Sequence, residues 1–171
     1  MNGANEKMKF TVENMDEISA SEILSWKYEE PYDFYNNELN AEGIKELVEN
    51  NYSVVLNQNR KLIGFFCAGS SAQVPSGAKV GVYIEDIIDI GLGMAPALTG
   101  KGNGLMFFSF VLESLCKTYG NVPVRLSVAT FNQRAIHLYE KCGFIKEMEF
   151  TTDSAEFQTM RRDSLCQGEE I

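Results

Sequence analysis

Few residues in this 171-residue chain favour binding to metals, nucleic acids or membranes. A single histidine and four cysteines without paired spacing do not predict a zinc site. Lysine and arginine total 15 against 24 for aspartate and glutamate, and this net charge of −9 argues against nucleic acids and anionic membrane surfaces as partners. No apolar run approaches the roughly 18 residues that span a bilayer. The acidic balance is compatible with a cationic amine substrate.

The first ten residues, MNGANEKMKF, are polar and contain no signal-peptide core, so we expect a cytoplasmic protein. In that reducing compartment we expect buried free thiols rather than disulfides at Cys67, Cys116, Cys142 and Cys166. The length and the hydrophobic content of 44% suit one domain with a proper core. We therefore expect a single domain over residues 1–171, with a polar tail from about residue 163.

Short extended segments alternate with helical ones along the chain. Apolar periodicity and turn residues predict strands at 9–13, 52–56, 62–68, 83–94, 122–129, 145–150 and 157–160. The same reasoning predicts helices at 16–26, 41–50, 102–119 and 132–143, and loops at 28–37 and 70–81. The helix predicted at 102–119 is strongly apolar, and we expect one stripe along it to be formed by Leu105, Phe108, Leu112, Leu115 and Tyr119.

The segment with the clearest functional signal is a strand followed by a glycine-rich turn and a helix. In residues 88–94, apolar side chains alternate with Asp89 and two glycines, so we expect one packed face and one nearly bare face carrying a carboxylate. The turn that follows Pro96 reads Thr99-Gly100-Lys101-Gly102-Asn103-Gly104. Free N–H groups at the start of the helix, its dipole and Lys101 together favour a phosphate over a plain tight turn, which remains the alternative.

Two familiar phosphate motifs do not fit this turn. The Walker pattern fails because Ala95 lies five positions before Gly100, and Gly102 occupies the place of the magnesium-binding hydroxyl. The dinucleotide fingerprint fails because Gly100, Gly102 and Gly104 are spaced two apart.

The segment resembles instead the pyrophosphate loop of the GNAT superfamily of N-acetyltransferases, a strand ending in apolar-x-Pro and then Q/R-x-x-G-x-G/A. Thr99 replaces the usual glutamine or arginine. A second motif of that superfamily, N-x-x-A-x-x-L-Y-E-K-x-G-F, is matched by Asn132, Ala135, Leu138, Tyr139, Glu140, Lys141, Gly143 and Phe144. The residues alone have a simpler alternative, an ordinary amphipathic helix with Asn132 as its N-cap and Gly143 just past its last turn.

The resemblance implies a fold, an activity and a set of cofactor contacts. The fold is α/β of the α+β type, a mixed but mostly antiparallel twisted sheet of about six to seven strands, splayed at its central strands, with flanking helices. The activity is transfer of an acetyl group from acetyl-CoA to a primary amine, in a small molecule or at a protein N-terminus or lysine, by direct attack and without a metal. The implied cofactor contacts are Leu92, Gly93, Met94, Thr99, Gly100, Lys101, Gly102, Asn103, Gly104, Asn132 and Tyr139, with Arg134 or Lys141 as candidates for the 3′-phosphate.

Two residues are candidates for the chemistry itself. By resemblance, Tyr139 protonates the leaving thiolate. Asp89 is our candidate for the base that takes the proton of the amine, with Glu85, Asp86 and a relay through solvent left open. His137 is expected to be a surface residue, because it lies opposite Tyr139 by helical spacing.

The aromatic and acidic loop at 28–37 is the predicted acceptor wall. Its rings and carboxylates suit a cationic amine, and the candidate substrate residues are Tyr28, Glu29, Tyr32, Asp33 and Tyr35. The alternative for this loop is a segment pinned to the core by its rings. For the whole chain the alternative is a non-catalytic acyl-CoA sensor. We expect an amine acceptor and no nucleic acid or membrane partner. Formation of a homodimer is left open.

Overall fold

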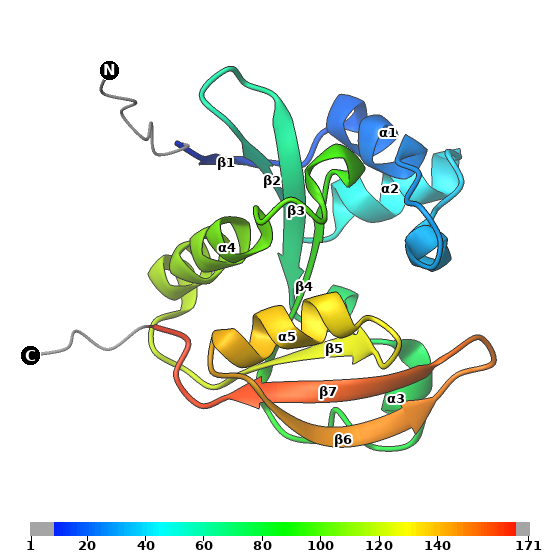
Figure 1. Cartoon of the computed structure of the whole chain (residues 1–171), viewed down its shortest axis with the longest axis vertical. Helices are drawn as coiled ribbons and strands as arrows, with labels where there is room; N and C mark the ends of the chain where they lie inside the picture. Colours follow the sequence, from blue (N-terminus) through cyan, green and yellow to red (C-terminus); the bar gives the residue numbers. More distant parts are fainter. Residues whose placement is uncertain (1–8, 167–171) are drawn as a thin grey trace, which may run out of the picture.

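A single mixed sheet organises the part of the chain that the computed structural model describes, residues 9–166 (Figure 1). Its strand order is β1-β2-β3-β4-β5-β7-β6, and every neighbouring pair is antiparallel except β4 and β5. The strands are β1 (Thr11–Asn14), β2 (Tyr52–Leu56), β3 (Leu62–Ala68), β4 (Ile88–Met94), β5 (Val124–Ala129), β6 (Ile145–Thr151) and β7 (Glu156–Arg162). The expected mixed, mostly antiparallel sheet is confirmed.

The five α-helices are α1 (Glu17–Ser25), α2 (Ala41–Glu49), α3 (Pro75–Lys79), α4 (Gly104–Tyr119) and α5 (Gln133–Lys141). Polar caps define three of their starts, because the side chains of Asp16, Asn40 and Asn132 each accept a hydrogen bond from a backbone N–H three residues on. Beyond α5, Gly143 has a φ of +86°, which ends the helix as its sequence predicts.

The parallel pair β4 and β5 separates partway along its length. Pairing runs from Ile88 with Val124 to Ile90 with Leu126 and then stops. Both strands continue, β4 to Met94 and β5 to Ala129, and they diverge in Figure 1. This is the splay that the sequence resemblance implied.

Apolar side chains fill both faces of the sheet. Helices α4 and α5 supply much of the larger cluster, in which Phe108 and Val111 are fully buried. Helices α1 and α2 cover β2 and β3 in a second cluster around Ala20 and Leu47. The expected stripe on α4 is wrong at its two ends. Leu105 in the first turn is 50% exposed and Tyr119 in the last turn is 41% exposed, whereas Phe108, Leu112 and Leu115 between them are buried.

The connection from β3 to β4 is more structured than a loop. It contains a 3₁₀ turn at Ser70–Ala72 and the short helix α3. The central strand begins at Ile88 rather than at 83, because residues 80–83 form a turn after α3. In this turn the Tyr83 hydroxyl accepts a hydrogen bond from the backbone N–H of Val74. The face of β4 that carries Asp89 is therefore covered, and Asp89 is only 2% exposed.

The cysteine prediction is wrong for one pair. Cys116, near the end of α4, forms a disulfide with Cys166, 50 residues further on, while Cys67 and Cys142 are free. The expected polar tail is packed as far as Cys166, since Leu165 is 1% exposed and its N–H bonds to the carbonyl of Val122. The rest of that tail and the N-terminal eight residues lie outside the described part.

Within residues 9–166, none of the helices has the length and apolar character that a membrane span requires. The same residues contain no cluster of three or more histidine, cysteine, aspartate or glutamate side chains able to hold a metal ion.

Candidate active site

A cavity of about 900 Å³ opens where β4 and β5 separate. One side is formed by residues 92–94 of β4 and the other by residues 127–129 of β5. The glycine-rich turn and the start of α4 close one end, α5 contributes a long wall, and the segment before α2 contributes another. The cavity therefore lies in the gap that lost strand pairing leaves in the sheet.

The separation also directs backbone groups of β4 into the cavity. The backbone N–H of Ala95 donates to the carbonyl of Ile63, and the carbonyl of Asp89 accepts from the N–H of Gly69. The backbone N–H and C=O groups of odd-numbered residues in β4 therefore point toward β3. Backbone groups alternate in direction along a strand, so those of Leu92 and Met94 face the side of β5. Pairing with β5 has already ended at Ile90, which leaves the N–H groups of Leu92 and Met94 available to a ligand.

The glycine-rich turn adopts the backbone conformation that its composition suggested. Gly100 and Gly102 have φ values of +70° and +80°, in the left-handed region that favours glycine. The Thr99 hydroxyl donates to the carbonyl of Pro96 at 2.8 Å, and the Asn103 amide donates to the carbonyl of Leu98 at 3.1 Å. These two side chains hold the turn in shape. Since Thr99 is occupied in this way, the turn offers backbone N–H groups rather than a side-chain donor.

Most of the predicted cofactor residues line the cavity. Those that do are Leu92, Gly93, Met94, Thr99, Gly100, Gly102, Gly104, Asn132 and Tyr139. Lys101 and Asn103 are not among the lining residues, because Lys101 is exposed on the outside of the turn and Asn103 points back to Leu98.

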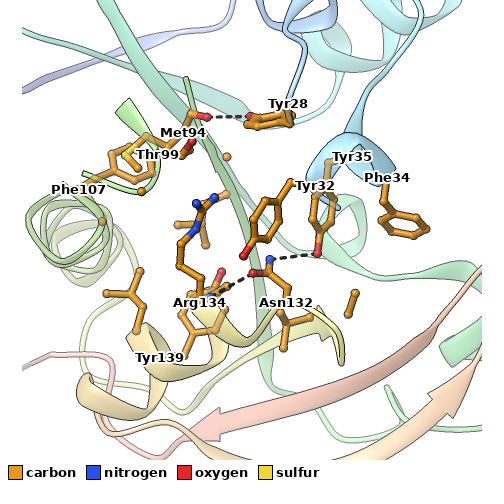
Figure 2. A pocket seen from close by; sticks show the side chains of 18 of the residues that line it. Tyr28, Tyr32, Phe34, Tyr35, Met94, Thr99, Phe107, Asn132, Arg134 and Tyr139 are labelled. Carbon is orange, nitrogen blue, oxygen red and sulfur yellow. Dashed lines mark hydrogen bonds between the residues drawn. The ribbon is translucent and has the colours of Figure 1, made fainter. Parts of the chain in front are cut away.

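Arg134 on α5 places a cation beside this turn. Its Nη1 lies 3.1 Å from the position that a Cβ on Gly100 would occupy, and its guanidinium sits 4.1 Å from the centroid of the Tyr32 ring (Figure 2). Lys141 also lines the cavity. Arg134 and the start of α4 together make the end of the cavity at the turn suitable for phosphate groups.

Tyr139 faces the cavity from the middle of α5. Its ring packs edge-on against Phe108 at 5.0 Å between centroids and lies 6.3 Å from Phe144. Burial raises the pKa of the Tyr139 hydroxyl. The group therefore keeps its proton at neutral pH, as a proton donor requires.

The segment from Tyr28 to Asn37 bridges the end of β4 and the start of α5 (Figure 2). The Tyr28 hydroxyl donates to the carbonyl of Met94 on β4 at 2.7 Å, and burial raises the pKa of Tyr28 to about 12. At the other end, the Asn132 amide donates to the Tyr35 hydroxyl at 3.1 Å. A 3₁₀ helix at Tyr32–Tyr35 lies between these anchors. The loop is thus pinned by its rings and also lines the cavity, and its role as the acceptor wall stays a prediction.

The structure places the predicted acceptor residues in two groups. Tyr28, Tyr32 and Tyr35 line the cavity. Glu29 and Asp33, on the same segment, are exposed and do not line it. Sequence reasoning missed the other aromatic residues of the lining, which are Trp26, Phe34, Phe65, Phe107 and Phe157.

Asp89 does not fit the role of base. Its carboxylate accepts two hydrogen bonds from the guanidinium of Arg125, at 2.7 and 2.9 Å, and a third from Gln73 at 2.8 Å. Both members of this ion pair are 2% exposed, and neither lines the cavity. The alternatives Glu85 and Asp86 are exposed and also lie outside the lining. Among the described residues, none of those that line the cavity carries a carboxylate.

Ser127, His137 and Asn37 are further polar residues of the lining. The Ser127 hydroxyl lies 2.6 Å from that of Tyr83, whose oxygen is in turn fixed by Val74, so the serine is held in place at the end of β5. His137 is exposed, as its spacing predicts, and reaches the rim of the cavity. No local motif marks Ser127, because the residue that orients it lies 44 positions earlier in the chain.

Comparison with known proteins gives one family and one fold. The profile of the acetyltransferase (GNAT) family matches residues 15–144. A spermidine N(1)-acetyltransferase from Vibrio cholerae is 28% identical over 157 residues, which cover 85% of this chain and 81% of that protein.

Two solved structures are similar in fold at 18% identity each. An uncharacterised protein from Bacillus halodurans has a TM-score of 0.72 over 91% of this chain and 84% of its own. An aminoglycoside acetyltransferase, AAC(6′)-Ib in complex with coenzyme A, has a TM-score of 0.66 over 91% of this chain and 95% of its own.

Proposed function

The chain belongs to the acetyltransferase (GNAT) family and is an acetyl-CoA-dependent N-acetyltransferase, and we propose that its acceptor is the primary amine of a small molecule. The observation that carries this proposal is the cavity between the separated strands, which joins a phosphate-binding end to an aromatic wall. The relative from Vibrio cholerae, named for acetylation of spermidine, supports a small amine over a protein acceptor. Both substrates are bound together when the amine attacks.

The residues of the cavity fit acetyl-CoA, which supplies an acetyl group activated as a thioester. The N–H groups at the start of α4 hold the pyrophosphate, and the left-handed conformation of Gly100 and Gly102 exposes them. Arg134 neutralises phosphate charge at the same end, with its guanidinium held against Tyr32. Lys141 contributes a second positive charge.

The backbone of β4 stabilises negative charge that develops on the thioester oxygen. The N–H groups of Leu92 and Met94 face the cavity and have lost their partner strand, so they donate without first breaking a hydrogen bond. The bond from Tyr28 to the carbonyl of Met94 fixes the strand where these donors lie. Preorganised donors of this kind are typically worth about 3–4 kcal/mol each in the transition state.

Tyr139 supplies the proton that the departing thiolate takes up. Its raised pKa keeps it protonated until the thiolate forms, and its ring is held by Phe108 so that the hydroxyl faces the cavity. The Tyr35 hydroxyl, fixed by Asn132, lies on the facing wall.

Water carries away the proton of the amine. None of the described lining residues has a carboxylate, and Asp89 is held by Arg125. The ammonium therefore loses one proton to solvent before the amine attacks, which is the relay that the sequence left open. The proton that the nitrogen releases as the amide forms passes through water to Tyr139, which has given its own proton to the thiolate.

Calorimetric titration with acetyl-CoA and with coenzyme A, followed by turnover of a panel of primary amines, tests this function. We expect binding of both nucleotides and release of free thiol in the presence of a small amine. Binding of acetyl-CoA with turnover only on peptide N-termini or lysines would refute the small-molecule acceptor. Failure to bind acetyl-CoA would refute the assignment of the glycine-rich turn.

A further inference from the structure

The geometry points to an acceptor that carries one primary amine on an apolar body, an alkylamine or arylalkylamine rather than a polyamine. This inference rests on the proposed function and specifies its substrate class. It follows from the aromatic side chains that line the cavity away from the glycine-rich turn and from the position of the charged groups.

Five aromatic rings from four parts of the chain form the acceptor side of the cavity. Trp26 follows α1, Phe65 belongs to β3, and Phe157 belongs to β7, while Tyr28 and Phe34 come from the bridging segment. Such a surface favours contact with hydrocarbon or an aromatic ring, and each buried methylene contributes to affinity.

Neighbouring rings hold this wall in place before any substrate binds. The Trp26 and Phe65 rings lie 6.1 Å apart, and the Phe34 ring lies 6.2 Å from that of Phe157. Phe157 in turn stacks on Phe150 at 5.5 Å with an interplanar angle of 11°. A wall built from packed rings cannot withdraw to make room for water, so it selects substrates by their apolar surface.

The described lining offers no negatively charged side chain to a second ammonium group on the substrate. The charged side chains that line the cavity, Arg134 and Lys141, are both cationic, and Arg134 lies beside the phosphate-binding turn. The carboxylates next to wall residues in the sequence, Glu29, Asp33 and Glu156, are exposed and do not line the cavity. The reacting amine loses its charge before attack, but any further ammonium group stays charged and finds no described carboxylate in the lining.

The uncharged polar groups are few and suit a single amine. Ser127 is fixed by Tyr83 at the end of β5, and Asn37 lines the cavity beyond the bridging 3₁₀ helix. One hydroxyl can orient one amine near the separated strands. The remaining surface on this side is aromatic or aliphatic.

A matched series of amines tests this substrate class with the full-length protein at saturating acetyl-CoA. We expect kcat/KM to rise by about fourfold per methylene from propylamine to hexylamine, because each methylene is buried against the rings. We expect 1,6-diaminohexane, which differs from hexylamine by one terminal amine, to be at least about tenfold poorer, with spermidine poorer still. Equal or better turnover of the diamine or of spermidine would overturn the inference and leave the proposed function standing. No turnover of any amine would overturn both.

A charge placed in the wall provides a second test. Phe34 is 39% exposed, so Phe34→Glu is expected to fold and to bind acetyl-CoA as the wild type does. The variant should raise the ratio of diamine to monoamine turnover by about tenfold, because it supplies the missing carboxylate. Ile145→Glu, on the outer strand β6 where Ile145 is 73% exposed, is the matched control and should leave the ratio unchanged. An unchanged ratio in Phe34→Glu, with acetyl-CoA binding intact, would refute this placement of the acceptor body.

Discussion

Replacing Asp89 by asparagine separates a structural role from a catalytic one. The sequence places this carboxylate on the central strand beside two glycines, where a base would suit the chemistry. The structure instead gives it two hydrogen bonds from Arg125 and one from Gln73, with both members of the ion pair 2% exposed. Asp89→Asn keeps the shape of the side chain and removes its charge, which leaves the Arg125 guanidinium buried without a counterion.

We expect Asp89→Asn to lower the free energy of unfolding. Breaking a buried ion pair from one side costs about 3–5 kcal/mol, because the remaining charge stays desolvated. For a chain of this length, about 2–4 °C of melting temperature is lost per kcal/mol, so we expect a fall of roughly 10 °C. Loss of a general base would instead lower the rate by about 10²–10⁴-fold.

Thermal unfolding and steady-state kinetics on the same preparation distinguish the two roles. Assayed well below its melting temperature, Asp89→Asn should keep kcat/KM within about threefold of the wild type, a difference below the usual effect of removing a base. Asp86→Asn, which changes an exposed carboxylate, is the control and should alter neither property. The double variant Asp89→Leu/Arg125→Met should regain much of the lost stability, because it removes both charges. A rate loss of a hundredfold with unchanged melting temperature would refute the structural role.

Three further predictions concern the turn, the leaving group and the disulfide. Gly102→Ala should weaken acetyl-CoA binding by about five- to thirtyfold in calorimetry, because a φ of +80° strains alanine, whereas Gly120→Ala should affect only the melting temperature. Tyr139→Phe should retain acetyl-CoA binding and lose most of kcat. In the wild type, the pKa of Tyr139 is raised, so a fall in rate caused by loss of its proton should occur only above pH 10. Below pH 10, kcat/KM should rise with pH because the amine substrate loses its proton. Reduction of the Cys116–Cys166 bond should lower the free energy of unfolding by up to about 4 kcal/mol, and thiol titration of the unreduced protein should find two free cysteines, not four.

Elements whose signals are local could be predicted closely. The hairpin of β2 and β3 has the predicted bounds, since two apolar runs flank a turn in which the Asn57 side chain accepts from two backbone N–H groups. Helix α5 begins after Asn132 and ends before Gly143, as its cap residues indicate. In such segments the residues that determine the structure lie within a few positions of one another.

Features that depend on distant residues could not be predicted from the pattern. Asp89 is bonded to Arg125, 36 positions later, and no local spacing reveals that a strand partner will neutralise it. Cys116 and Cys166 are 50 residues apart, and their proximity follows only from packing of the chain after β7 against the end of α4. The cavity lining likewise takes rings from β3 and β7, which look like ordinary core residues in the sequence.

The glycines of the central segment show how one residue type serves two physical purposes. In the turn, Gly100 and Gly102 allow a left-handed backbone that exposes N–H groups to an anion. In β4, a Cβ on Gly93 would lie 2.5 Å from the Phe65 ring, and one on Gly91 would lie 3.1 Å from the sulfur of Cys67. These strand glycines therefore make room for side chains of the neighbouring strand β3 rather than for a ligand. Because Phe65 lines the cavity, the absence of a side chain at Gly93 lets an aromatic ring lie across β4 and line the cavity there.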